Sequence, residues 1–192
     1  MDTFTYIVSL SWAAFILFWV ISAFGAKRDL GRSPWRRLAW LRIVIVAVIL
    51  TVIWKKEPLG ALAQHWGISQ AVPANTALAA IGTVLCLLGV AFAIWARVHL
   101  GRNWSAAPAL KEDHELITSG PYSLVRHPIY TGIIAAALGT AFVIPVWAAL
   151  FIVISGIFIW RVRVEESLMT KQFPNQYPDY KKRTWALIPY VW

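Results

Sequence analysis

Charged residues and cysteine are both scarce in this chain. Only 14% of its 192 residues are charged, against about 25% in a typical soluble domain, so too few polar side chains are present to cover a water-facing surface. Cys86 is the one cysteine and cannot form a disulfide within the chain. No group of Cys and His residues has the spacing of metal ligands. A soluble globular domain, a disulfide scaffold and a structural zinc module are therefore excluded.

Acidic residues are scarcer than basic ones. The chain has 9 Asp and Glu against 18 Lys and Arg, a formal net charge of +9. The cations lie in short runs beside apolar segments, which is the pattern of loops at a bilayer surface and not of a nucleic-acid interface. A G-x-G-x-x-G motif is also absent, which argues against a Rossmann-type cofactor site. The composition predicts an integral membrane protein that binds neither nucleic acid nor metal.

Three segments are long and apolar enough to be membrane helices, namely residues 4–24, 38–54 and 75–96. A helix needs about 20 residues to cross the hydrocarbon. The first segment lacks the basic start of a cleaved signal peptide, so we expect it to stay on the chain. Residues 58–73 contain two Pro and two Gly and are expected to form an irregular or interfacial loop.

The longest uncharged run covers residues 128–160, with Pro145 near its middle. As one straight helix its 33 residues would be roughly 50 Å long, against a hydrocarbon core of about 30 Å. Proline disfavours a helical conformation at the residue before it, so the run predicts a tight hairpin with arms at 129–144 and 146–160. Two pairs in the first arm have the spacing that lets helix backbones approach closely: Gly132 with Ala136, and Ala135 with Gly139.

A hairpin with arms of near-equal length brings two polar clusters together at its open end. Residues 126–130 lie at its entry and residues 161–166 at its exit. Residues 101–128, ahead of it, form a polar loop with two His and three Pro in a chain otherwise poor in such residues. We therefore expect the functional site at this end of the hairpin.

Two motifs in this region resemble one known family. From His114 to Tyr130 the chain reads H-x-L-I-x-x-G-P-Y-x-x-x-R-H-P-x-Y, and E-E at Glu165 and Glu166 is followed by F-x-x-x-Y-x-x-Y from Phe173. This two-part pattern resembles the isoprenylcysteine carboxyl methyltransferase family, over residues 97–189. The resemblance implies a membrane-embedded methyltransferase that uses S-adenosylmethionine and acts on an amphiphilic, isoprenylcysteine-like acceptor.

The resemblance also implies roles for individual residues. Arg161 would hold the carboxylate of the acceptor. The residues implied to contact the cofactor are His114, Leu116, Ile117, Tyr122, His127, Pro128, Ile129, Tyr130 and Glu165. A cofactor with a sulfonium, an ammonium, a carboxylate and an adenine needs an acid, hydrogen-bond donors and aromatic surface, and the polar members of this set are of those types.

Each part of the pattern also has a plainer interpretation. Arg161 and Glu165 are four residues apart and could form only a surface ion pair. His127 and Pro128 could mark only a helix start, and His114 could lie in a solvated loop. We expect Tyr177 and Tyr180 to serve packing, and His65 and His99 to have no chemical role.

Three rival functions remain open from the sequence. The R-H-P-x-Y motif and the acidic pair are similar to those of lipid amine N-methyltransferases, such as enzymes that methylate phosphatidylethanolamine. The C-terminal part is similar to membrane sterol reductases, which use a nicotinamide cofactor. A non-enzymatic membrane scaffold is the third rival, and it predicts no cofactor binding at all.

Together these features predict an all-α integral membrane protein with five transmembrane helices, a C-terminal helical hairpin, and a cytoplasmic cofactor-binding loop and tail. Residues 1–96 would hold membrane helices one to three, and residues 97–192 the catalytic region. We expect a multi-pass protein of a bacterial or archaeal cell membrane.

The distribution of cations predicts the orientation. With the N-terminus outside, every Lys and Arg except Lys55 and Lys56 falls in an inside segment, as the positive-inside rule requires. Reporter fusions at Asp2 and Lys182 test this prediction, and the fusion at Lys182 should read as cytoplasmic. A periplasmic or extracellular signal there would contradict the five-span arrangement.

Overall fold

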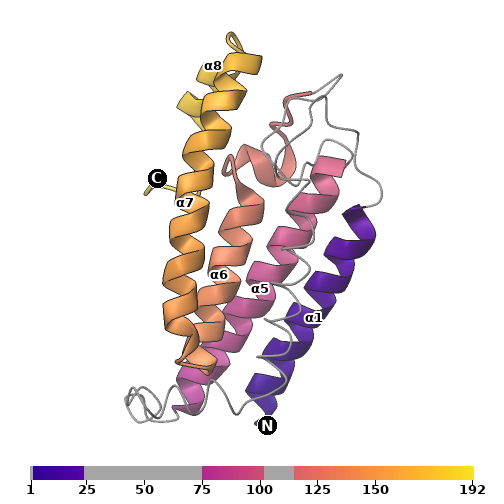
Figure 1. Cartoon of the computed structure of the whole chain (residues 1–192), viewed down its shortest axis with the longest axis vertical. Helices are drawn as coiled ribbons and strands as arrows, with labels where there is room; N and C mark the ends of the chain where they lie inside the picture. Colours follow the sequence, from indigo (N-terminus) through magenta and orange to yellow (C-terminus); the bar gives the residue numbers. More distant parts are fainter. Residues whose placement is uncertain (1, 24–74, 102–114) are drawn as a thin grey trace, which may run out of the picture.

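The computed structural model describes residues 2–23, 75–101 and 115–192. All regular elements in these ranges are helical: α1 (Thr3–Ala23), α5 (Thr76–Leu100), the short 3-10 helix η3 (Gly120–Ser123), α6 (Pro128–Val143), α7 (Trp147–Gln172) and α8 (Tyr177–Arg183). The four long helices run side by side in the order α1, α5, α6, α7, and α8 lies beyond the end of α7 (Figure 1). The predicted all-α class is confirmed.

Three of these helices are long and apolar enough to cross a membrane: residues Thr3–Ser22, Thr76–Leu100 and Trp147–Gln172. Helix α6 is apolar but has only 16 residues. Many large apolar side chains on the long helices are exposed, including Leu17, Leu88 and Ile152, as expected for surfaces that face lipid. The predicted span at 38–54 and the loop at 58–73 lie outside the described residues, so the count of five spans stays a prediction.

Helices α5 and α6 pack backbone against backbone. A Cβ atom added to Gly89 would lie 2.5 Å from Ala136 N, and one added to Gly132 would lie 2.5 Å from Gly89 O. Gly82 and Gly139 face each other in the same way two turns away. The predicted close approach is therefore confirmed for Gly132, Ala136 and Gly139, and their partner is α5.

Polar side chains fasten α1 to this pair. Trp12 Nε1 donates to Thr140 Oγ1 on α6 at 2.9 Å. At the other end, the buried guanidinium of Arg97 donates to the carbonyl of Ser22 at 2.7 Å and to that of Gly101 at 2.9 Å. Because carbonyls at a helix end lack partners within the helix, Arg97 satisfies the ends of α1 and α5 together.

The hairpin forms at Pro145, as predicted. Trp147 N donates to Ile144 O and Ala148 N to Pro145 O, both at 2.9 Å, and these bonds close the turn. The predicted end of the second arm at residue 160 is wrong, because α7 continues to Gln172. Residues 161–172 include two Arg, two Glu and one each of Leu, Met, Lys and Gln, which are strong helix formers, so the helix persists where the apolar segment stops.

The close contact between α5 and α6 generates a stability prediction. Gly89→Ala should destabilise the protein by about 1–3 kcal/mol, because the new methyl group meets backbone atoms that cannot move aside. Gly156→Ala is the matched control, since no atom of the described residues lies within 4 Å of its added Cβ and alanine favours helix over glycine by about 1 kcal/mol. Thermal unfolding in detergent measures both variants. Equal melting temperatures would contradict the proposed close packing.

Candidate functional site

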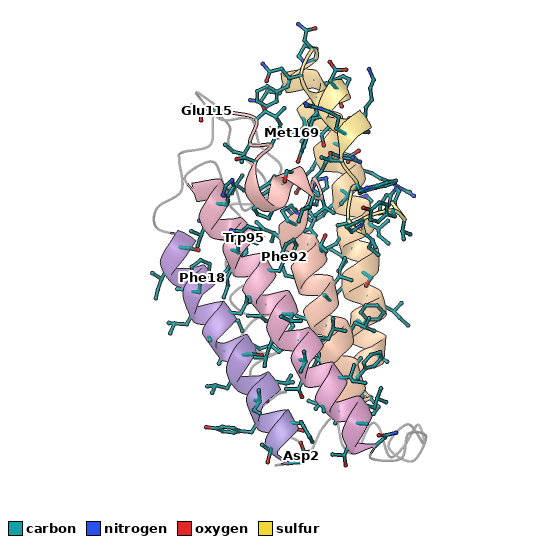
Figure 2. All side chains as sticks on the ribbon, turned by 180° about the vertical axis from the view of Figure 1, so that it is seen from behind. Asp2, Phe18, Phe92, Trp95, Glu115 and Met169 are labelled. Atoms are coloured by element: carbon teal, nitrogen blue, oxygen red, sulfur yellow. The ribbon has the colours of Figure 1, made fainter. Side chains whose placement is uncertain are left out.

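Polar side chains concentrate at one end of the bundle, around η3, the start of α6, the end of α7 and α8 (Figure 2). The hairpin brings the two predicted clusters into contact there. Arg126 Nε lies 2.6 Å from Glu166 Oε1, and His127 Nδ1 lies 3.6 Å from Glu165 Oε2. Residues 126–130 and 161–166 therefore lie side by side, as expected from the sequence.

Glu165 is the centre of one group of contacts. Its Oε1 accepts a hydrogen bond from the Tyr130 hydroxyl and another, of 3.0 Å, from Arg161 NH2. The Arg161 guanidinium carbon lies 5.6 Å from the centre of the Tyr130 ring, and the Phe158 ring stacks on that ring at 4.4 Å. The result is a carboxylate and a guanidinium beside aromatic surface, with both charged side chains about four-fifths buried.

The imidazole of His127 lies between the two glutamates. It stacks parallel to the Tyr130 ring at 5.6 Å, and Nε2 lies 3.6 Å from Glu166 Oε1. This buried Nε2 makes no hydrogen bond to any residue that the structure describes. Burial alone would lower the pKa of His127, but the two neighbouring carboxylates outweigh burial and hold the pKa above its usual value.

Glu166 has a different set of partners. It binds Arg126 through Oε1 and Lys181 Nζ through Oε2 at 2.7 Å. The Arg126 guanidinium also donates to the carbonyls of Lys181 and Thr184. Glu166 thus joins α7 to the start of α6 and to α8.

Tyr122 is a buried residue of η3, in the segment that precedes α6. Its hydroxyl points to the carbonyl of Ala96 at 3.4 Å, and its own carbonyl accepts a 2.6 Å hydrogen bond from Tyr180. Burial raises the pKa of Tyr122 strongly, so the phenol remains a neutral donor. It packs in one cluster with Ala96 and Ile129.

The predicted site residues fall into two connected groups. Ile117, Tyr122, Ile129 and Tyr130 belong to one apolar cluster, and His127, Tyr130, Arg161 and Glu165 make the polar contacts described above. Pro128 is buried as the first residue of α6, and Leu116 is half-buried ahead of η3. His114 lies outside the described residues. Tyr130 belongs to both groups and connects them.

The plainer interpretations are partly realised. Arg161 and Glu165 do form an i,i+4 ion pair, but both side chains also contact Tyr130 from another helix. Pro128 does begin a helix. Tyr177 and Tyr180 are buried, which confirms their predicted packing role.

The sequence interpretation placed Glu166 and Arg126 in the two polar clusters but not among the site residues, and it missed Lys181 altogether. The E-E pair and the Arg of the R-H-P motif were visible signals for the first two. Nothing in the sequence pointed to Lys181 or to the backbone carbonyls of residues 185 and 186, which accept hydrogen bonds from Arg126 N and His127 N.

Comparison with known proteins identifies the family. The sequence model of the phospholipid methyltransferase family matches residues 77–176, which is more than half of the chain. The chain belongs to this family. The matched region includes nearly all of α5, the R-H-P-x-Y motif and the acidic pair. The contacts of His127, Tyr130, Arg161 and Glu165 therefore lie inside it, whereas Lys181 lies beyond its end.

Several similar proteins are named as protein-S-isoprenylcysteine O-methyltransferases. The chain is 30% identical to protein-S-isoprenylcysteine O-methyltransferase B of Arabidopsis thaliana, over 68% of this chain and 64% of that protein. It is 36% identical to protein-S-isoprenylcysteine O-methyltransferase of Schizosaccharomyces pombe, over 50% of this chain and 43% of that protein. The assignment to the isoprenylcysteine carboxyl methyltransferase family is confirmed.

A solved structure is similar in fold. It is the eukaryotic intramembrane Ras methyltransferase, isoprenylcysteine carboxyl methyltransferase, with a TM-score of 0.55 and 26% identity. The match covers 84% of this chain and 55% of that one. The chain thus spans between 43% and 64% of the length of these three proteins. This likeness and the apolar helices make it an integral membrane protein.

The environment of His127 generates a prediction of pH dependence. Because its pKa is raised in the folded protein, its contribution to stability is fully present below the ordinary histidine pKa of about 6.5 and is lost as the pH rises through the raised value. The melting-temperature difference between wild type and His127→Gln should therefore be largest near pH 6 and shrink toward alkaline pH. A difference that grows with pH would contradict the assignment.

Proposed function

We propose that the protein transfers a methyl group from S-adenosylmethionine to the carboxylate of an amphiphilic, isoprenylcysteine-like acceptor at the cytoplasmic face of the membrane. The observation that carries the proposal is the meeting of His127, Tyr130, Arg161 and Glu165 across the hairpin. The names of the relatives support the same reaction.

The residues fit a cofactor that carries both signs of charge. Glu165 supplies an acceptor for a cationic group, and the stacked rings of Tyr130 and Phe158 supply a surface that attracts cations. Nε2 of His127 lies 3.6 Å from Glu166 Oε1, too far for a hydrogen bond, and has no other partner within the described residues, so a donor remains there for an anionic group. S-adenosylmethionine has a sulfonium, an ammonium and a carboxylate, and when bound it supplies an activated methyl group.

Arg161 is the residue that suits a carboxylate acceptor. A guanidinium binds a carboxylate through two parallel hydrogen bonds and fixes its direction. Arg161 uses NH2 for Glu165, and its Nε is buried without a hydrogen bond among the described residues. It therefore has unused donors for a second carboxylate beside the first.

The proposed chemistry needs positioning more than proton transfer. A carboxylate is ionised at neutral pH and can attack a methyl group without a general base. The residues of the site have to align it, hold it against Arg161 and exclude water, which strengthens every charge interaction. The mostly buried side chains of His127, Tyr130 and Glu165 are suited to this task.

A lipid amine acceptor, as in phosphatidylethanolamine methylation, is the second candidate. The description of the matching family as phospholipid methyltransferase favours it. An amine would need a carboxylate partner or a base, and it would gain nothing from Arg161. The effect of removing Arg161 therefore discriminates between the two acceptors.

Methyl transfer from labelled S-adenosylmethionine to prenyl-cysteine, lipid-amine and total-lipid acceptors tests the proposal. Arg161→Ala should lower kcat/KM for a carboxylate acceptor about tenfold to a hundredfold, since a charge-assisted contact contributes roughly 1.5–3 kcal/mol. It should leave cofactor affinity nearly unchanged, whereas Glu165→Ala and His127→Ala should each weaken cofactor binding in calorimetric titration. Arg161→Lys should recover little.

Arg163→Ala is the matched control, because Arg163 is on the same helix and exposed. Transfer by Arg161→Ala at the level of this control would argue against the carboxylate acceptor and favour the amine. Titration of a nicotinamide cofactor in parallel tests the reductase rival. Binding of neither cofactor by the folded protein would leave only the scaffold.

A further inference from the structure

A short segment near the C-terminal end lies against the start of α6. We call residues 184–187 the strap. Arg126 N donates to Trp185 O at 2.8 Å, and His127 N donates to Ala186 O at 3.1 Å. One turn further along, Thr131 Oγ1 donates to Leu187 O at 2.7 Å. Three successive carbonyls of the strap therefore accept hydrogen bonds from Arg126, His127 and Thr131, at the start of α6.

The inner side of the strap is part of the protein interior. Ala186 and Leu187 are buried together with Val162 of α7, and Tyr130 and Ile134 of α6 pack against them. Tyr130 is thus in contact with the strap cluster on one side and with Glu165 on the other. Movement of the strap would free the surfaces that hold both the backbone of His127 and the ring of Tyr130.

Ion pairs and charged hydrogen bonds hold the strap at the end that follows α8. Arg126 donates to the carbonyls of Lys181 and Thr184, which precede and begin the strap. Glu166 binds Arg126 Nε at 2.6 Å and Lys181 Nζ at 2.7 Å, with one carboxylate oxygen for each. Glu166 is only 12% exposed in its side chain, so water screens these contacts weakly.

We propose that the strap forms a wall of the cofactor site, and that Glu166 is the positioning residue that keeps the strap closed through Arg126 and Lys181. The two adjacent glutamates then have separate tasks. Glu165 faces Arg161 and Tyr130, whereas both oxygens of Glu166 are engaged by the cations that hold the strap. The assignment of the wall rests on the proposed function, whereas the closure of the strap does not.

Hydrogen exchange tests the closure directly, because the amides of Arg126 and His127 donate to the strap. Their exchange rates report how often these bonds open. In the ligand-free full-length protein, Glu166→Gln and Lys181→Ala should speed exchange of both amides by about tenfold, in line with the loss of one charge-assisted contact. The two variants also guard against a folding defect, since Lys181 is 42% exposed and its truncation is the milder change.

Lys182→Ala is the matched control. Lys182 is the next residue on α8 and also forms an ion pair, 2.9 Å long, but its partner is the exposed Asp179. Its truncation should leave both amides as protected as in the wild type. Equal exchange in Glu166→Gln, Lys181→Ala and Lys182→Ala would overturn the assignment of Glu166.

The proposed role of the strap as a wall of the cofactor site is tested by separate measurements, with ligand bound. Saturating S-adenosylhomocysteine, the demethylated product, should restore protection of both amides in Glu166→Gln. The same variant should show a raised KM for S-adenosylmethionine with kcat within about twofold of wild type, because binding closes the strap. Glu165→Gln should weaken binding without faster exchange. A Glu166→Gln protein that binds the product but leaves both amides unprotected would overturn the wall.

Absence of binding by the wild type would overturn the proposed function, and with it the wall. The exchange comparison needs neither ligand nor activity, so it still decides whether Glu166 closes the strap.

Discussion

The structure of the polar end of the bundle depends on the need to pair two adjacent, mostly buried carboxylates. The side chains of Glu165 and Glu166 are 19% and 12% exposed, and a carboxylate removed from water is costly unless it is paired. Neighbouring residues on a helix point about 100° apart, so the two cannot use one set of partners. Glu165 takes Arg161 and Tyr130, Glu166 takes cations from the start of α6 and from α8, and His127 lies between them. Three helices are thereby fixed around one site.

The apolar part of the fold makes these pairings available. The turn at Pro145 returns α7 alongside α6, so residues at the open end of the hairpin meet although they are 35–40 positions apart. Gly89 and Gly132 bring α5 against α6 with no side chain between them, which places Ala96 of α5 within reach of the Tyr122 hydroxyl. The packing of the apolar region therefore determines the geometry of the polar region, because a shift of α5 against α6 displaces Tyr122.

The sequence predicted those features that depend on chain length and composition. An uncharged run too long for one span, with Pro145 at its centre, was enough to predict the hairpin and the meeting of its two polar ends. It could not predict that Gly132 packs on Gly89, because the spacing of small residues identifies the packing face of a helix but not the helix that packs against it. The contact of Glu166 with Lys181 and the binding of the strap carbonyls depend on where α8 folds back, and a carbonyl acceptor has no signature in sequence. The end of α7 was missed because hydropathy reports where lipid stops, whereas helix propensity decides where the helix stops.

The ion pair between Arg161 and Glu165 bears on the choice of acceptor. The two side chains neutralise each other beside Tyr130, so within the described residues the charge of each is paired. In the proposed reaction a cationic cofactor and an anionic acceptor enter together, and each finds an opposite charge, the cation at Glu165 and the anion at Arg161. The total charge stays balanced, and transfer of the methyl group then neutralises cation and anion at once, which a low-dielectric site favours. A neutral amine would leave Arg161 without a new partner and would create a positive charge beside it. On electrostatic grounds the Arg161 and Glu165 pair therefore suits a carboxylate acceptor better than an amine.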